Sequence, residues 1–290
     1  MVINLHLWLA NGKGIRQGIC ISRLMCPQLR ELTEEVIVEF IRQKVEESGS
    51  SGVVIGLSGG VDSAVTSRLC EEALGPDAVL NIFMPSSTTP LRDRRDAEDF
   101  CSHFGMRLKT VDIQPAVDAL VEALPELSDK MLLGNAMART RMSVLFHHAK
   151  LMRRVVMGTS NKSELLVGYF TKFGDGGADF CPIGDLYKSE VRELARKIGV
   201  PQDIIDKVPT AGLWEGQTDE GEMGITYDDL DPVLIGFELS LSDEEIAHRT
   251  GLPLETVETV WQMHRSTVHK RKMPLIPKLG FRTIGLDWRE

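Results

Sequence analysis

From residue 53 onward the sequence alternates short apolar runs with helical patterns, and few folds accommodate that order. The apolar runs are rich in β-branched residues, which favour strands, and the segments between them have helical periodicity. Such an alternation predicts crossover units and a doubly wound parallel sheet with helices on both faces, an α/β fold. The apolar runs read VVIGL, AVLNIFMP, RLKTVDI and VVMGTS, and the helical patterns between them include SAVTSRLCEEALG, DRRDAEDFCSHFG and residues 135–154.

The two ends of the chain depart from this alternation. Residues 1–27 lack a clear period and are predicted to be an extension, with Met25 a candidate start, ahead of one domain spanning 28–290. The pattern LTEEVIVEFIRQKVEES predicts a helix with Thr33 as its N-cap. Toward the carboxyl end, the polar tract 208–227 is predicted to be a mobile loop, and SDEEIAHRTG and LETVETVWQMHRSTVHKRK predict a helical extension.

Composition narrows the classes of function. A chain of 290 residues with 42% hydrophobic residues can bury a full core, and its formal net charge of −9 argues against coating nucleic acid. The five cysteines form no C-x-x-C pair, which favours reduced thiols. No apolar run reaches the length of a membrane span, and no basic residue precedes the apolar start as in a signal peptide. We therefore expect a cytoplasmic protein without a membrane or nucleic-acid partner.

The stretch GVVIGLSGGVDSAV, residues 52–65, is compatible with two chemistries. Within it, GLSGG matches the G-x-S-x-G elbow that exposes a nucleophilic serine, here Ser58. That elbow needs an oxyanion loop on an earlier strand, whereas VVIGL is predicted to be the first strand. The elbow interpretation is therefore the weaker one.

The alternative interpretation is a phosphate-binding turn. Gly59 and Gly60 allow the backbone to approach an anion, Ser58 and Ser63 supply hydroxyl groups, and a helix expected to begin near Asp62 points free N–H groups at the ligand. Because Asp62 would repel a bare phosphate, its presence indicates a bridging Mg²⁺ ion. The loops SGGVDS, MPSSTTP and GTSNKSE all follow predicted strands, so we expect them to share one crevice at the carboxyl edge of the sheet.

These residues, together with several longer strings, resemble the adenylating ATP pyrophosphatases, and specifically the ammonia-dependent NAD synthetase family. The strings are GNAMARTRM, GTSNKSELLVGYFTKFGDGGADFCPIGDLYKSEV, VPTAGL, DEGEMGITYDDLD and HKRK. The resemblance implies a homodimer with an adenine nucleotide alpha hydrolase-like fold. It also implies that deamido-NAD attacks ATP with loss of pyrophosphate, and that ammonia then displaces AMP to form NAD.

The resemblance also assigns roles to residues. Asp62 and Glu164 are similar to the Mg²⁺ ligands, and Asp175 and Lys188 to catalytic residues, with Asp175 near the ammonia. ATP contacts are implied for Gly56, Leu57, Ser58, Gly59, Gly60, Val61, Asp62, Ser63, Thr159, Lys188 and Thr210. Deamido-NAD contacts are implied for Arg139, Lys172, Asp179, His269 and Lys270.

Each of these residues also has an ordinary structural interpretation. Asp62 and Glu164 suit the first turn of a helix, and Asp175 suits a glycine turn. Of the neighbouring arginines, the motif favours Arg139 as functional and leaves Arg141 on a basic helix face. In the run HKRK, Arg271 and Lys272 are interpreted as solvent-exposed charges, and His147 and His148 as plain helix residues, without metal-ligand spacing.

Other functions stay open at this stage. A GMP synthetase-like or tRNA-thiolating enzyme shares the phosphate loop, although thiolation requires paired cysteines that the chain lacks. A nucleotide-binding regulator without turnover is the alternative from another class. The chain has no room for a glutaminase domain, so free ammonia is the expected donor. Loops at 85–96 and 206–227 are hypothesised to close over substrate.

Overall fold

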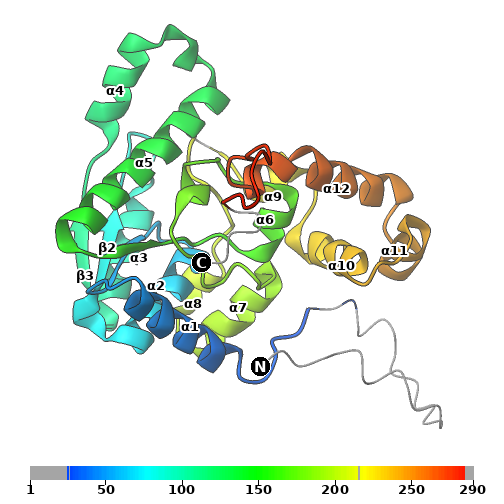
Figure 1. Ribbon diagram of the computed structural model, residues 1–290, viewed down its shortest axis with the longest axis horizontal. Coiled ribbons are helices and arrows are strands. Elements are labelled where there is room, and N and C mark those ends of the chain that lie inside the picture. The colour runs from blue at the N-terminus through cyan, green and yellow to red at the C-terminus, as the bar shows by residue number, and fades with distance from the viewer. Residues whose placement is uncertain (1–24, 26, 215, 285–290) are drawn as a thin grey trace.

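The computed structural model describes residues 25, 27–214 and 216–284. A four-stranded parallel sheet lies at its centre, with the strand order β3-β2-β1-β4 (Figure 1). The strands are β1 (Val53–Gly56), β2 (Val79–Phe83), β3 (Arg107–Thr110) and β4 (Val155–Met157). The chain adds β2 and β3 on one side of β1 and then returns to add β4 on the other. This order confirms the predicted α/β fold and places the switch in direction between β1 and β4, where such sheets bind ligands.

Helices cover both faces of the sheet because β1, β2 and β4 are buried on both sides, whereas the edge strand β3 is largely exposed. The helices of this α/β part are α1 (Thr33–Glu47), α2 (Val61–Leu74), α3 (Leu91–His103), α4 (Gln114–Ala123), α5 (Lys130–Met152), α6 (Lys162–Val167), α7 (Lys188–Lys197) and α8 (Gln202–Ile205), with short 3-10 turns η3 (Pro76–Ala78), η4 (Pro125–Ser128) and η5 (Asp175–Gly177). Val53 and Ile55 pack into one core with α1, α2, α3 and α7, while Val54 packs into a second core with α4 and α5.

A third core lies among the carboxyl-terminal helices, to the right of the sheet in Figure 1. It forms around Tyr227 and Leu230, both fully buried, and also contains Val167 of α6 and Met25. Its elements are α9 (Asp219–Met223), α10 (Tyr227–Glu238), α11 (Asp243–Thr250), α12 (Leu254–Ser266) and the 3-10 turn η6 (Val268–Arg271). The predicted helical extension is therefore present and packs against α6.

Several predicted boundaries are wrong. Leu32, with a positive φ of 66°, precedes α1, and Thr33 is its first helical residue, with a hydroxyl that donates to the Arg30 carbonyl. The helix expected at 135–154 begins at Lys130, because the Asp129 side chain accepts from two N–H groups of its first turn. The supposed loop at 208–227 contains α9, and α10 follows it without having been predicted at all. In the same way, α3 already begins within the loop expected at 85–96.

Arg271 is not the solvent-exposed charge that the sequence predicted. Its guanidinium donates to the carbonyls of Leu165 and Leu166 at the end of α6, at 3.1 and 2.9 Å. It also donates to the His264 carbonyl in the last turn of α12, at 2.6 Å. A cation in contact with carbonyls at the ends of two helices stabilises both ends. Lys272, by contrast, is exposed as predicted.

Other expectations fall partly outside the described residues. The predicted extension at 1–27 lies there except for Met25 and Pro27, so it stays a prediction. Cys20 and Cys26 also lie outside, while the described cysteines, Cys70, Cys101 and Cys181, are free thiols. None of the helices described between residues 25 and 284 is long and apolar enough to cross a membrane.

The role of Arg271 can be tested by Arg271→Met, which keeps much of the side-chain volume and removes the donors. We expect the free energy of unfolding to fall by about 1–3 kcal/mol, because the carbonyls at two helix ends lose a charged hydrogen-bond donor. The matched variant Lys272→Met should change it by less than about 0.5 kcal/mol. Urea unfolding followed by circular dichroism measures both values, and equal effects would contradict the capping role.

Candidate active site

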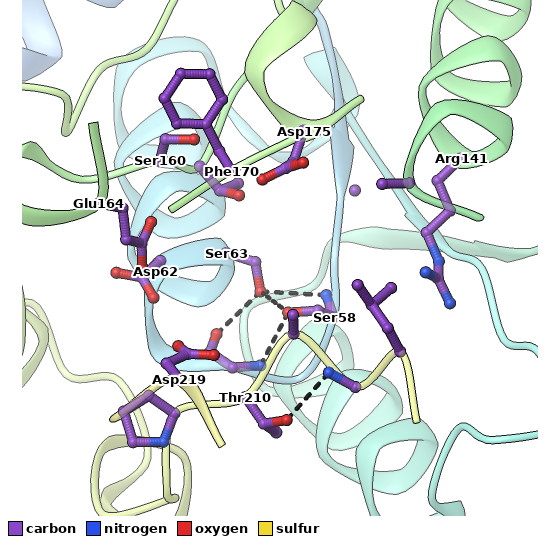
Figure 2. A pocket seen from close by; sticks show the side chains of 18 of the residues that line it. Ser58, Asp62, Ser63, Arg141, Ser160, Glu164, Phe170, Asp175, Thr210 and Asp219 are labelled. Carbon is purple, nitrogen blue, oxygen red and sulfur yellow. Dashed lines mark hydrogen bonds between the residues drawn. The ribbon is translucent and has the colours of Figure 1, made fainter. Parts of the chain in front are cut away.

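A pocket of about 380 Å³ lies at the carboxyl ends of β1, β2 and β4, within the usual size range of ligand sites. The loops after these strands line it, as the sequence predicted, together with residues from α5 and from the segment 207–222. Figure 2 shows Asp62 beside Glu164 on one wall and Arg141 on the other side of the pocket. The predicted residues that line it are Gly56, Leu57, Ser58, Gly60, Val61, Asp62, Ser63, Thr159, Glu164, Asp175, Lys188, Thr210 and Lys270.

The loop after β1 has the geometry of an anion site. The Ser58 N–H donates to the Ser63 hydroxyl at 3.2 Å, and that hydroxyl donates to the Gly60 carbonyl at 2.9 Å. Gly60 is the N-cap residue of α2 and has no side chain that could accept from the first N–H groups of this helix. Gly59 has a φ of 80°, and a Cβ there would stand 2.7 Å from the Asp93 carbonyl oxygen. The turn therefore requires glycine, and it presents N–H groups to the pocket.

A buried ammonium group joins the two predicted metal ligands. Lys188 is 1% exposed, and its Nζ lies 2.5 Å from Asp62 Oδ2 and 3.4 Å from Glu164 Oε1. Asn161 fixes both carboxylates, since its side-chain amide donates to Asp62 Oδ1 at 3.0 Å and its backbone N–H donates to Glu164 Oε2 at 3.3 Å. Burial by itself lowers the pKa of Lys188, but attraction to the two carboxylates outweighs it and the pKa stands above its usual value.

Asp219, which the sequence analysis missed, adds a third carboxylate to this group. It is 5% exposed and accepts hydrogen bonds from the Tyr169 and Tyr227 hydroxyls, at 3.1 and 3.3 Å. Because one ammonium cannot neutralise three carboxylates, negative charge is in excess here. Burial raises the pKa of Glu164 to about 8, with Lys188 opposing the shift and the other two carboxylates adding to it. Burial likewise raises the pKa of Asp219.

This donor set fits a hard divalent cation. Among the residues described, no group of three or more His, Cys, Asp or Glu side chains has an arrangement that would hold a metal by itself. Mg²⁺ usually takes one or two carboxylates and completes its shell with water and phosphate oxygens. Asp62 and Glu164, which lie side by side next to an anion-binding loop (Figure 2), meet that requirement.

Lys207 was also missed, and it joins three segments of the pocket wall. Its Nζ lies 2.6 Å from carboxylate oxygens of both Asp93 and Asp96 and donates to the Gly59 carbonyl at 3.1 Å. All three charged side chains are about 15% exposed, so solvent screens the ion pairs only in part. The contact connects the phosphate-binding turn with α3 and with the start of the 207–214 segment. No local pattern marks Lys207, because its partners lie more than a hundred residues away.

The far side of the pocket holds Asp175 and Arg141. Asp175 is reached by solvent from the pocket and accepts from the Thr171 N–H at 2.9 Å. The surrounding protein atoms raise its pKa, while Thr171, Lys270 and Arg141 oppose the rise. Desolvation lowers the pKa of Arg141 to about 10, and Asp175 opposes that change.

The two arginines of the ARTR motif have different positions. Arg141 lines the pocket, and its Nε donates to the Met84 carbonyl at 3.0 Å. Arg139 is not among the pocket-lining residues and donates to the Lys172 carbonyl at 3.3 Å. The sequence analysis left Arg141 on a basic helix face, so its place in the pocket corrects that interpretation. The role predicted for Arg139 stays a prediction.

The other residues predicted to contact the dinucleotide divide into two places. Lys172 donates to the His269 carbonyl at 2.7 Å, which brings those two residues together beside the pocket. Lys270 lines the pocket and donates to the carbonyls of Gly168 and Phe170, at 2.8 and 2.9 Å. Asp179 is not a lining residue, and its carboxylate accepts from the Val156 N–H of β4 at 2.8 Å. Asp179 thus has a structural role in this chain, and its substrate contact stays a prediction.

Comparison with known proteins places this pocket in a family. A family model described as NAD synthase matches residues 33–274. The chain belongs to the NAD synthase family. Among curated members, the NH₃-dependent NAD⁺ synthetases of Methanosarcina acetivorans and Pyrococcus horikoshii are each 46% identical to it, over 86% and 89% of this chain and 98% and 100% of theirs.

Solved structures of the family share the fold. The NMN synthetase from Francisella tularensis has a TM-score of 0.76 and 36% identity, covering 85% of this chain and 98% of that one. The NH₃-dependent NAD synthetase from Campylobacter jejuni has a TM-score of 0.72 and 34% identity, covering 85% and 97%. A glutamine-dependent NAD⁺ synthetase from Acinetobacter baumannii, with a TM-score of 0.64 and 27% identity, matches 91% of this chain but 50% of its own length.

The raised pKa of the buried Glu164 carboxyl predicts a pH-dependent cost in stability. The carboxyl ionises near 4.5 in the unfolded chain and near 8 in the folded one, so between these values the folded state holds an extra proton. Stability should therefore fall as pH rises from about 4.5 to 8. Glutamine cannot ionise, so Glu164→Gln should gain stability relative to the wild type as pH rises.

Urea unfolding of the ligand-free protein between pH 5 and 8 measures this difference. Glu98→Gln, an exposed acid paired with Arg94 on the surface, is the control and should show the same small difference at each pH. If the stability difference between Glu164→Gln and the wild type does not change with pH, the pKa of Glu164 is not raised in the folded protein.

Proposed function

We propose that the chain catalyses the ATP-dependent amidation of deamido-NAD with ammonia, giving NAD, AMP and pyrophosphate through an adenylated intermediate. The observation that carries the proposal is the buried Lys188 ammonium between Asp62 and Glu164, next to the phosphate-binding turn. Membership of the NAD synthase family supports the assignment. The chain is thus a ligase of NAD biosynthesis.

The chemistry explains why such a pocket is needed. A carboxylate resists attack by ammonia, because its leaving group would be oxide, and transfer of AMP supplies a better leaving group. The phosphate turn would hold the triphosphate through its N–H groups, and Thr159 and Thr210 would contact ATP from the pocket wall. Lys188 would neutralise charge that develops on the departing pyrophosphate. Mg²⁺, held by Asp62 and Glu164, would supply further positive charge to the phosphate oxygens.

Asp175 is the candidate proton acceptor in the second half of the reaction. Ammonium must lose a proton before its nitrogen can attack the adenylated carboxyl carbon. A carboxylate with a raised pKa suits that transfer better than an ordinary one, because its affinity for the proton lies closer to working pH. We place the ammonia between Asp175 and the adenylated carbon, on the Arg141 side of the pocket.

The dinucleotide is proposed to extend from this pocket toward Lys172, His269 and Lys270. The contact of Lys172 with the His269 carbonyl brings the two predicted segments together and supports one shared binding surface. Arg139 lies against the same segment through its hydrogen bond to the Lys172 carbonyl. We propose a cytoplasmic homodimer in which this surface is completed by a second copy.

The nitrogen donor is proposed to be free ammonia. The Acinetobacter baumannii relative named as glutamine-dependent is about twice the matched length, whereas the curated relatives named as NH₃-dependent are matched almost in full. The likeness to a protein named NMN synthetase favours one second candidate, amidation of the mononucleotide. That reaction would use the same adenylation chemistry on a smaller substrate.

An assay of nicotinamide product tests these proposals. The protein is supplied with ATP, Mg²⁺ and either deamido-NAD or nicotinic acid mononucleotide, with ammonium or glutamine in parallel. We expect NAD from deamido-NAD with ammonium alone. Asp62→Asn should lower kcat/KM by about 100-fold, because a charged ligand for the phosphate-bound cation is lost.

Asp77→Asn is the matched control, since Asp77 is an exposed acid paired with Arg107 far from the pocket. It should leave kcat/KM within about twofold. Preference for the mononucleotide would replace the proposed substrate by the second candidate. Absence of product from both substrates, in a folded protein that binds ATP, would contradict the proposed function.

A further inference from the structure

Asp231 is a fully buried carboxylate on α10 that no part of the proposed chemistry uses. Its Oδ1 accepts from the Ser163 hydroxyl at 2.5 Å. Its Oδ2 accepts from the N–H and the hydroxyl of Ser189, at 3.0 and 2.7 Å. Both oxygens therefore bind donors on other helices, α6 and α7, and Asp231 joins three helices that are far apart in the sequence.

The serines that Asp231 holds are sequence neighbours of the two pocket residues. Ser163 directly precedes Glu164, and Ser189 directly follows Lys188. The Lys188 N–H also donates to the Ser163 hydroxyl oxygen at 3.0 Å, which links the first turns of α6 and α7. Through these bonds, Asp231 fixes the backbone from which both pocket side chains extend.

The same helix also contacts the two side chains themselves. Tyr227 lies four residues before Asp231, so both are on one face of α10. The Tyr227 hydroxyl donates to Glu164 Oε1 at 3.3 Å, and the Lys188 ammonium lies 4.9 Å from the centre of the Tyr227 ring. Helix α10 thus holds Lys188 and Glu164 at their backbone through Asp231 and at their side-chain ends through Tyr227.

A buried carboxylate is a costly way to join helices. Burial raises the pKa of Asp231, although the hydrogen bonds from Ser163 and Ser189 oppose the rise. An apolar residue of similar size would avoid this cost, and apolar replacements of buried charged groups are often neutral or stabilising. An apolar residue, however, could not accept the hydrogen bonds that orient the first turns of α6 and α7.

We propose that Asp231 is a positioning residue that sets where the Lys188 ammonium and the Glu164 carboxylate stand in the pocket. The proposal rests on the proposed function only in that the pocket binds ATP with a divalent cation. Asp231 does not contact substrate. It acts through the paired serines, and its loss should lower activity by displacing the two pocket groups.

The main test is Asp231→Leu, which keeps similar shape and removes both acceptors. We expect kcat/KM for NAD formation to fall by about 10- to 100-fold, the usual range for residues that orient metal ligands. Asp231→Asn retains part of the hydrogen bonding and should recover part of that loss. The control is Asp228→Leu, which makes the same change at an exposed acid on the same helix and should stay within about twofold.

A double-mutant cycle separates positioning from a general effect on folding. If Asp231 acts through Glu164, the loss in the combined Asp231→Leu, Glu164→Gln variant should be clearly smaller than the product of the two single losses. The proposal would be overturned if the loss in the combined variant equals the product of the two single losses. It would also be overturned if Asp231→Leu has the kcat/KM of the wild type. Should Asp231→Leu fail to fold, Asp231→Asn carries the same cycle.

Calorimetry with ATP and Mg²⁺ gives a readout independent of turnover. We expect ATP with Mg²⁺ to bind the Asp231→Leu variant more weakly than the wild type. The loss of affinity in the combined variant should again be smaller than the product of the two single losses. Unchanged affinity in Asp231→Leu would count against the proposal. If the wild type makes no NAD but binds ATP with Mg²⁺, the proposed function fails while this binding cycle still decides the role of Asp231.

Discussion

The buried ammonium of Lys188 is the interaction on which the rest of the site depends. It comes from the first residue of α7 and meets carboxylates from α2 and α6, so it connects segments that are separated by more than a hundred residues. A lone ammonium at this depth would be strongly destabilising, and the two carboxylates make its burial possible. Conversely, the carboxylates without Lys188 would repel each other and the triphosphate that the adjacent turn is built to bind.

The carboxyl-terminal helices build the pocket as much as the sheet does. The sheet places the phosphate-binding turn and the loop after β4 at its switch point, as parallel α/β sheets commonly do. Helices α9 and α10 then bring Asp219, Tyr227 and Asp231 against the Lys188 group. Arg271 holds the ends of α6 and α12 together, and this keeps the third core against the α/β part. The extension is therefore a structural part of the candidate active site.

Much of the site could be predicted because its signals are local. The alternation of apolar runs determines a parallel sheet, and a glycine-rich turn between a strand and a helix predicts an anion site within a few residues. Long-range partners leave no such signal. Lys207 has no pattern around it, since Asp93 and Asp96 are far away in the sequence.

Helix α10 escaped prediction for a local reason. It begins with three acidic residues in its first five positions and carries Pro232 in its interior, features that resemble a polar loop. Pro232 is the sixth residue of this helix and cannot donate a backbone hydrogen bond there, and burial of Leu230 and Leu234 stabilises the element in spite of that loss. The position of Arg141 in the pocket could not be predicted either, because only the direction of α5 decides which of the two neighbouring arginines lines it.

The central claim is that this pocket transfers AMP to the substrate carboxylate before ammonia attacks. Deamido-NAD labelled with oxygen-18 in the nicotinate carboxylate tests it directly by mass spectrometry of the products. If the carboxylate attacks the α-phosphate of ATP, AMP keeps one carboxylate oxygen when ammonia displaces it, so AMP should carry one labelled oxygen per turnover. NAD formed with unlabelled AMP, or with the label in pyrophosphate, would contradict the account.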